Sequence, residues 1–220
     1  MDAYAGILGT SGFTAYAGVF GMFDLQPDEC FVVSAAGGAV GTAAGEFAKL
    51  RGARVIGIAG GKDKCRTLID RLGFDAAVDY KADLGGGLDT VCPDGIDFYF
   101  ENVGGEVQRE VFARMRNNGR IAMCGQVAQY TGGGQADGPN LMSVILRQLS
   151  IRGFLSTITF SELIPQFERD VAAWLREGKV SNLTTIINGM ENAHEAINNL
   201  VSGQIVGKQL LQFSEDPTRS

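Results

Sequence analysis

The sequence has few cysteines, and none of them lie close together. Cys30, Cys65, Cys92 and Cys124 include no Cys-x-x-Cys pair. This spacing argues against a disulfide framework and against a zinc site made from these residues alone. The one histidine, His194, lies in a polar segment typical of an exposed helix, so we do not expect it to be catalytic. We therefore predict reduced thiols, no bound metal and a cytoplasmic location.

Long apolar runs and basic clusters are also absent. No segment approaches the length of a membrane span, and the first residues show no basic-then-apolar leader pattern. The formal net charge is −6, from 25 acidic and 19 basic residues. Such a balance gives no general electrostatic attraction to nucleic acid or to anionic lipid. We expect neither a nucleic acid nor a membrane as a partner.

What the chain does contain is an ordinary globular composition, with 45% hydrophobic and 20% charged residues. The clearest pattern lies at residues 31–64. An apolar run at 31–33 predicts a buried strand, and a turn of small residues follows it. Helical periodicity then extends from Val40 to Leu50, and a second apolar run at 54–59 completes a βαβ unit.

The turn in this unit reads A-x-G-x-x-G, with Ala36 where the dinucleotide fingerprint has its first glycine. Gly38 would let the backbone approach a pyrophosphate, and Gly41 would let the helix pack closely on the strand. The helix N-terminus, at Ala39 and Val40, would present N–H groups and a positive dipole end to the phosphates. The alternative is a tight turn that binds no ligand.

The rest of the chain alternates strands and helices. Further strands are expected at 76–80, 96–100, 120–124 and 150–155. This alternation predicts an α/β fold with a doubly wound, parallel, six-stranded Rossmann sheet. After about residue 156 we expect a helix at 161–175, a strand at 184–187, a helix at 191–201 and a strand at 208–213. The predicted organisation is a connecting helical segment at 1–29, a nucleotide-binding domain at 30–156 and a C-terminal part at 157–220.

The end of the second strand indicates which dinucleotide is bound. NAD-binding domains place a carboxylate there for the ribose 2′-hydroxyl, but this chain has Ala59 and Gly60. Lys64 follows on the next helix, and Tyr80 closes the third strand. A missing carboxylate with cations nearby favours a 2′-phosphate, and therefore NADP. The alternative for the cations is a solvated basic helix face. The missing acid also argues against a methyltransferase.

An ordered series of motifs spans nearly the whole chain. They are LGTSGFTAYAG (8–18), VVSAAGGAVG (32–41), GIAGGKDK (57–64), DYK (79–81), ENVGGE (101–106), CGQVAQY (124–130), RGFL (152–155) and GQIVGK (203–208). In this series the chain resembles the zinc-independent medium-chain dehydrogenase/reductase superfamily. Within it, the chain is most similar to the branch of leukotriene B4 12-hydroxydehydrogenases, prostaglandin reductases and NADPH-dependent curcumin reductases.

The resemblance implies an NADP(H)-dependent reductase of α,β-unsaturated ketones and aldehydes, with hydride transfer to the β-carbon. It makes Tyr130 the catalytic candidate, because a phenol can hydrogen-bond or protonate the carbonyl oxygen as charge develops there. The implied cofactor contacts are the pyrophosphate at Ala36, Gly38 and Val40, the 2′-phosphate at Lys64 and Tyr80, and the ribose and nicotinamide along Asn102, Cys124 and Phe154. For Cys124 and Phe154 the alternative is packing at a strand end. A homodimer joined near residues 151–155 is also implied.

The chain departs from this superfamily in two places. Ile205 stands where the family usually has an asparagine that can bond the cofactor. The GroES-like barrel domain that precedes the nucleotide-binding half in the family is missing from this sequence, and residues from about 156 would partly return to that barrel. The alternative function is therefore a non-catalytic NADPH-binding module or an inactive truncated form. A short-chain dehydrogenase is excluded, since no tyrosine has a lysine four residues later.

Overall fold

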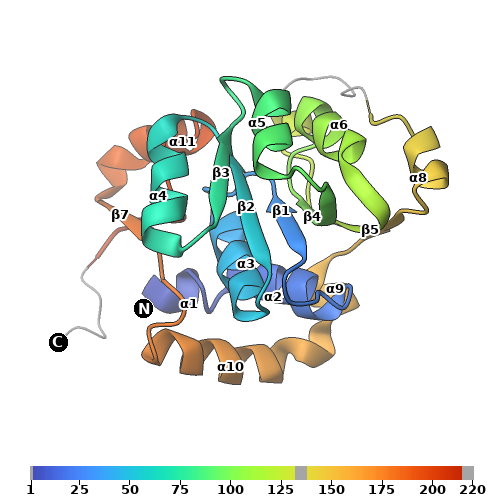
Figure 1. Ribbon diagram of the computed structural model, residues 1–220. Coiled ribbons are helices and arrows are strands. Elements are labelled where there is room, and N and C mark those ends of the chain that lie inside the picture. The colour runs from blue at the N-terminus through green and yellow to red at the C-terminus, as the bar shows by residue number, and fades with distance from the viewer. Residues whose placement is uncertain (1, 132–137, 215–220) are drawn as a thin grey trace.

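The computed structural model describes residues 2–131 and 138–214 (Figure 1). Its main feature is a parallel six-stranded sheet in the order β3-β2-β1-β4-β5-β6. The strands are β1 (Cys30–Val33), β2 (Arg54–Ala59), β3 (Ala76–Asp79), β4 (Ile96–Glu101), β5 (Met115–Met123) and β6 (Ser150–Gly153). This is the strand order of dinucleotide-binding folds, and it confirms the predicted doubly wound sheet.

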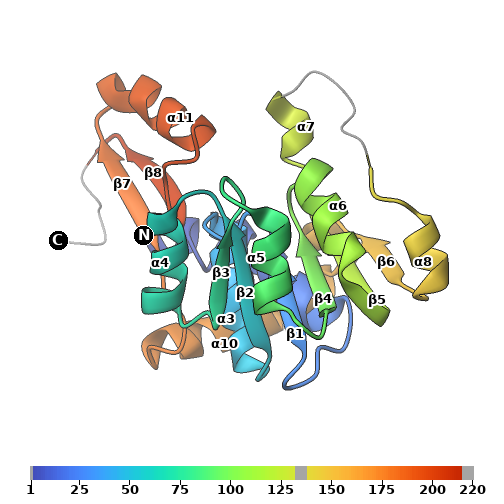
Figure 2. The same ribbon diagram turned by 45° about the horizontal axis from the view of Figure 1, so that its top comes forward.

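Helices cover both faces of the sheet because its central strands are apolar on both sides (Figures 1 and 2). All four residues of β1 are buried, with Phe31 and Val33 in one core and Val32 in the other. The first core is closed by α2 (Thr10–Tyr16), α3 (Ala39–Leu50), α4 (Lys62–Leu72) and α10 (Ile164–Arg176). The second is closed by α5 (Leu84–Val91) and α6 (Gly105–Ala113).

The segments before and after the sheet meet in the first of these cores. An aromatic cluster joins α2, the π-helix η1 (Ala17–Gly21), α3 and α10 through Tyr16, Phe20, Phe47, Phe167 and Trp174. The Tyr16 hydroxyl donates to an Asp170 carboxylate oxygen across 2.6 Å. Residues near both ends of the chain therefore pack as one layer on the sheet.

A small C-terminal lobe lies beside the sheet (Figure 2). It consists of β7 (Thr184–Asn188) and β8 (Lys208–Gln212), paired in parallel and connected through η3 (Met190–Asn192) and α11 (Ala193–Val201). The remaining short elements are α1 (Asp2–Ala5), α7 (Ala128–Thr131), α8 (Met142–Leu146), α9 (Ser156–Thr159) and η2 (Ser161–Leu163). Among the described residues, no helix combines the length and the apolar character that a membrane span requires.

Candidate dinucleotide-binding site

The candidate site lies at the carboxyl ends of β1 and β4, where the strand order reverses. Ligands of open α/β sheets bind in the crevice at this position. Ser34 follows β1 and Asn102 follows β4, and the two are joined twice. The Asn102 side-chain amide donates to the Ser34 carbonyl oxygen, and the Asn102 backbone N–H donates to the Ser34 hydroxyl, each across 2.8 Å. These bonds fix the two strand ends relative to each other.

The turn after β1 is as tight as its small residues suggest. Ala35 has a positive φ of 48°, and Gly38 is the N-cap of α3. A Cβ on Gly41 would lie 2.3 Å from the Ala35 carbonyl oxygen and 2.7 Å from the Ala36 Cα. Because both atoms belong to the backbone, no side chain fits there. Gly41 thus has the close packing expected of the last glycine in the fingerprint.

The N-terminus of α3 offers N–H groups to a ligand. The Thr42 N–H makes the first bond back along the helix, to the Gly38 carbonyl oxygen at 2.9 Å. The amides of Ala39, Val40 and Gly41 precede this bond, and amides in that position point out of the helix end. A positive dipole end and outward N–H groups together suit an anion.

Ala36, which stands at the first glycine position of the fingerprint, is held by packing and by a backbone hydrogen bond. Its N–H donates to the Ile58 carbonyl oxygen across 2.9 Å, and the residue is fully buried. Its methyl group faces Gly57 on β2, where an added Cβ would lie 2.9 Å from the Ala36 Cβ. The glycine on β2 therefore makes room for the alanine in the turn. Ala36 shapes the turn, and its amide is already paired.

Two lysines and a tyrosine gather at the end of β2. A Cβ on Gly60 would lie 2.8 Å from the Tyr80 ring and 3.0 Å from the Lys81 side chain. The Lys64 side chain runs beside Gly37, and its ammonium group donates to the Ile205 carbonyl oxygen across 2.8 Å. Burial, with a smaller contribution from the Lys81 charge, lowers the pKa of Lys64. An anion placed here would relieve this repulsion between cations.

Sequence reasoning missed two residues of this cluster. Lys81 is one, although it lies in the DYK segment of the family resemblance. Asp79 is the other, since its carboxylate accepts the N–H groups of Gly61 and Lys81 at 2.8 and 3.0 Å. These bonds lower the pKa of Asp79. They also tie the turn after β2 to the end of β3.

A buried carboxylate, that of Glu101, holds the loop after β4 in place. Glu101 is fully buried, and one of its oxygens accepts the Ser34 hydroxyl at 3.0 Å and the N–H groups of Val103 and Gly104 at 2.6 and 3.1 Å. Its other oxygen has no hydrogen-bond partner among the described residues, and neither has the Tyr99 hydroxyl. Burial raises the pKa of Tyr99 well above its ordinary value. The sequence pointed to the Asn102 loop, but not to the glutamate that fixes it.

Cys124 and Phe154 lie at the ends of β5 and β6, as predicted. The Cys124 N–H donates to the Glu101 carbonyl oxygen at 2.9 Å. Burial, helped by the Glu101 charge, raises the pKa of Cys124 to about 12, so its thiol is neutral at pH 7. The Phe154 ring packs in the core, with ring centroids 6.2 Å from Phe100 and 6.1 Å from Phe160. The ring therefore has the packing role that was the alternative for this residue.

The other predicted residues differ in how fully they are placed. β3 ends at Asp79, one residue earlier than expected, so Tyr80 follows directly after the strand, where it is 47% exposed. The backbone of Tyr130 lies in α7, but its side chain falls outside the part of the structure that is described.

His194 is exposed on α11, as expected. Within the described ranges, no group of three or more histidine, cysteine or acidic side chains is arranged to hold a metal.

Comparison with known proteins agrees with this geometry. Residues 39–170 match the sequence profile of the family described as "Zinc-binding dehydrogenase". The chain belongs to this family. The match confirms the dehydrogenase/reductase resemblance inferred from the motifs. It begins at the first residue of α3, runs through strands β2 to β6 and ends within α10.

Named relatives refine the comparison. The chain is 40% identical to the 2-alkenal reductase (NADP(+)-dependent) of Nicotiana tabacum, over 98% of this chain and 63% of that protein. It is 37% identical to the NADPH-dependent curcumin reductase of Escherichia coli, over 96% of this chain and 63% of that protein. Among solved structures, CurA from Vibrio vulnificus in complex with NADPH superposes with a TM-score of 0.91 at 38% identity, covering 97% of this chain and 66% of CurA. The chain thus spans slightly less than two thirds of these relatives.

Proposed function

We propose that this chain binds NADP(H) and forms the cofactor-binding part of a reductase that acts on activated carbon–carbon double bonds. The observation that carries the proposal is the cluster at the end of β2, where Lys64, Tyr80 and Lys81 surround a strand end without a carboxylate. A charged adenosine 2′-phosphate suits the two lysines of this cluster better than a neutral ribose hydroxyl does. The names of the relatives support the same cofactor.

The remaining predicted contacts follow from this placement. The N–H groups of Ala39, Val40 and Gly41 would receive the pyrophosphate, with Ala36 and Gly38 shaping the turn. The ribose and nicotinamide would lie along the ends of β4, β5 and β6, beside Asn102, Cys124 and Phe154. Phe154 would contribute its backbone there, because its ring is packed in the core. The Ile205 side chain cannot hydrogen-bond the cofactor, and its carbonyl oxygen accepts the Lys64 ammonium group.

The substrate we propose is an α,β-unsaturated ketone or aldehyde. NADPH, when bound, supplies a hydride, which is transferred to the β-carbon of the enone. Charge then develops on the carbonyl oxygen, and the Tyr130 hydroxyl would hydrogen-bond or protonate that oxygen. Support comes from the CGQVAQY motif and from the relatives named as 2-alkenal and curcumin reductases.

A second candidate is an NADPH-binding module without turnover. The chain spans 63% of the length of the two enzymes compared above, so the activity of those whole proteins does not carry over to it directly. In this candidate the cofactor cluster is intact and binds NADPH, but no substrate is reduced. We propose the domain limits accordingly, with cofactor binding at 30–156 and residues 157–220 packing partly against a barrel domain. The cytoplasmic location stays a prediction.

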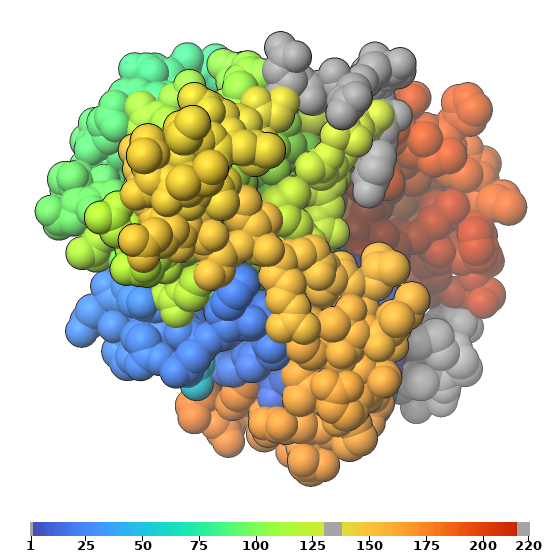
Figure 3. All heavy atoms as spheres, turned by 90° about the vertical axis from the view of Figure 1, so that its right-hand side faces the viewer, coloured from blue at the N-terminus to red at the C-terminus, as the bar shows by residue number. Residues whose placement is uncertain are grey.

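We also propose a homodimer joined along β6. Within the described part of the chain, β6 pairs on one side only, with β5, and all four of its residues are exposed. Figure 3 shows this face, where the yellow and orange segments around β6 are prominent. Apolar side chains are exposed along it at Leu141, Met142, Ile145, Leu146, Ile151, Leu155 and Ile158. An Ile151→Lys variant should shift the protein toward monomer in sedimentation equilibrium, because a charge on an edge strand opposes pairing.

Calorimetric titration with NADPH and NADH tests the proposed cofactor, and an enone assay tests the chemistry. We expect NADPH to bind at least about tenfold more tightly, as charge-assisted bonds to one phosphate would produce. Equal affinities, or tighter NADH, would refute the 2′-phosphate site. Tight NADPH binding without enone reduction, in the chain extended to the full length of its relatives, would favour the non-catalytic module.

A further inference from the structure

Two cysteines that are far apart in sequence meet at the amino-terminal end of the sheet, opposite the cofactor site at its carboxyl end. Cys30 begins β1, and Cys92 follows directly after α5. Their sulfur atoms lie 3.7 Å apart across a separation of 62 positions, and the Cys30 thiol donates to Cys92. The two residues are 8% and 5% exposed. Both sulfurs therefore lie just beneath the surface and in contact.

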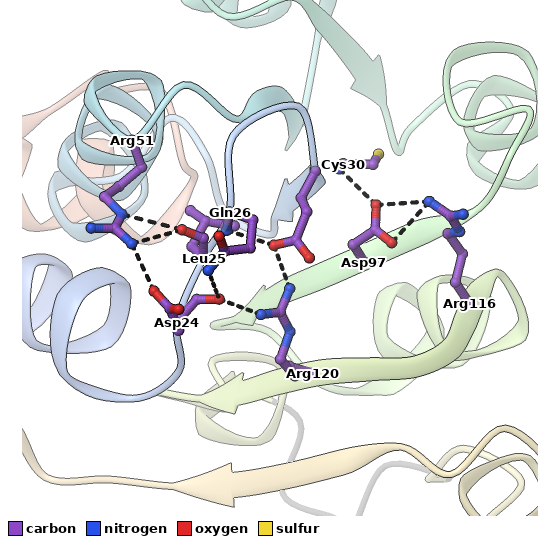
Figure 4. A network of polar contacts seen from close by, with 9 residues as sticks. Asp24, Leu25, Gln26, Cys30, Arg51, Asp97, Arg116 and Arg120 are labelled. Carbon is purple, nitrogen blue, oxygen red and sulfur yellow. Dashed lines mark hydrogen bonds and ion pairs between the residues drawn. The ribbon is translucent and has the colours of Figure 1, made fainter.

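Charged groups hold this pair from two sides. The Arg54 guanidinium lies 3.9 Å from the Cys30 sulfur and donates to the Val91 carbonyl oxygen at 2.7 Å, so it bridges the two cysteine-bearing segments. The Asp97 carboxylate accepts the Cys30 backbone N–H at 2.9 Å and pairs with Arg116 at 3.0 Å (Figure 4). The cysteine at the start of β1 is thus fixed through both its backbone and its sulfur.

The surroundings make the two thiols unequal. The hydrogen bond from Cys30 and the charges of Arg54 and Arg114 lower the pKa of Cys92. The pKa of Cys30 is raised, because its thiol donates that bond and is buried. Since the thiolate is the nucleophile in sulfur chemistry, Cys92 is the attacking sulfur and Cys30 the resolving one.

We propose that Cys30 and Cys92 form a peroxide-oxidisable dithiol, a modification site separate from the cofactor site. The Cys92 thiolate attacks one oxygen of a hydroperoxide, the O–O bond breaks, and an alcohol or water leaves after protonation. This step gives a sulfenic acid on Cys92. The Cys30 sulfur then attacks that sulfur, the S–S bond forms, the S–O bond breaks, and water leaves with the thiol proton. In total two thiols lose two electrons and the peroxide gains them.

The other two cysteines provide an internal comparison. Cys65 lies on α4 and is half-buried, and burial raises its pKa. Burial also raises the pKa of Cys124, to about 12. Neither has a sulfur partner in the hydrogen bonds of the described residues. If exposure alone decided reactivity, Cys65 would oxidise before the two buried cysteines.

Peptide mapping can test the site without ambiguity, because trypsin separates all four cysteines. Cys30 lies on the peptide that ends at Lys49, and Cys92 lies on peptide 82–109. The protein would be treated with about one equivalent of hydrogen peroxide, alkylated and digested without reduction. We expect the linked pair of these peptides, loss of two of the four free thiols, and recovery of both with dithiothreitol.

Matched variants complete the test. Cys92→Ser and Cys30→Ser should abolish the linked peptide, whereas Cys65→Ser and Cys124→Ser should leave its yield unchanged. The wild-type map is decisive even if one of the serine variants fails to fold. Faster oxidation of Cys65 than of the pair, or no linked peptide while both cysteines remain free, would overturn the proposal.

Discussion

The ammonium group of Lys64 donates a hydrogen bond to the carbonyl oxygen of Ile205, 141 positions later in the chain. Beside it, the Gly207 N–H donates to the Gly37 carbonyl oxygen across 2.8 Å, and the two glycine-containing segments form a parallel bridge at Gly38 and Gly207. The segment between α11 and β8 is thus attached to the candidate phosphate turn. Because an ammonium group has three N–H donors, Lys64 could hold a 2′-phosphate and the Ile205 carbonyl oxygen together.

We predict that Lys64→Ala weakens NADPH binding by about 10- to 100-fold, as expected for loss of a charge-assisted hydrogen bond. NADH binding should change little, because NADH has no 2′-phosphate. Lys62→Ala is the matched control, since Lys62 is exposed two residues earlier on the same helix. Calorimetric titration of each variant with both cofactors gives the comparison. Equal losses for NADPH and NADH would remove Lys64 from phosphate recognition.

Gly41→Ala should destabilise the fold. Its methyl group would meet backbone atoms at 2.3 and 2.7 Å, and backbone cannot move aside as a side chain can. We expect the free energy of unfolding in urea to fall by about 2–4 kcal/mol. Gly37→Ala is the control, because a Cβ there would meet only the Lys64 side chain, at 3.4 Å. If both variants lost a similar free energy of unfolding, the backbone contact at position 41 would not be the cause of the destabilisation.

Glu46 should make stability depend on pH. It is 6% exposed on α3 and accepts the Ser181 N–H at 2.9 Å. Burial, partly opposed by that bond, raises the pKa of Glu46 from 4.5 to about 7. The Glu46 carboxyl group therefore holds its proton more tightly in the folded state than in the unfolded state. Below pH 4.5 the group is neutral in both states and costs no stability. As the pH rises the folded state is increasingly destabilised, and the effect is complete above about pH 7.

Glu46→Gln should therefore stabilise the protein above pH 7 by roughly 3 kcal/mol and have little effect near pH 4, since the amide oxygen can still accept the Ser181 N–H. Thermal unfolding at a series of pH values measures this. Glu177→Gln, at a half-exposed carboxylate that pairs with Lys179, is the control and should change stability by less than about 1 kcal/mol, because an exposed ion pair contributes little. A Glu46→Gln effect that does not change with pH would contradict the buried-charge explanation.

Tyr130→Phe should lower the turnover of an enone by about 10²- to 10⁴-fold, the usual contribution of a positioned acid. NADPH affinity should remain within a few-fold of the original, because the phenol is proposed to act on the substrate oxygen. The variant needs the full-length protein and a steady-state assay at saturating NADPH. Tyr80→Phe is the comparison, because it should weaken NADPH binding and leave the turnover of the enone at saturating NADPH unchanged. Unchanged turnover would assign Tyr130 a purely structural role.

The fold could be predicted because its signals are local. The central strands β1, β2 and β4 are each marked by a short apolar run, and the spacing of the small residues in the turn reflects contacts within a few positions. The contacts that could not be predicted join distant segments, namely Cys30 with Cys92, Glu46 with Ser181, and Lys64 with Ile205. No periodicity records such a pairing, since it depends on how helices and lobes pack after they form.

Phe154 illustrates the same limit within one residue. The sequence placed it correctly at the end of β6, next to the candidate nicotinamide path. Its ring direction depends on Phe100 and Phe160, and on Gly18 of η1, where an added Cβ would lie 3.0 Å from that ring. These partners come from three separate segments. A motif locates a residue along the chain, but tertiary packing decides which of its atoms face a ligand.

The bond between Gly207 and Gly37 has a consequence for the order of synthesis. Proteins are made from the N-terminus, and early segments can fold while later ones are still being translated. Here β1 and its turn leave the ribosome long before the segment that contains Gly207. A nascent chain can thus assemble its sheet and still lack the glycine that pairs with its phosphate turn. Cofactor affinity should consequently mature late, when translation has passed residue 207.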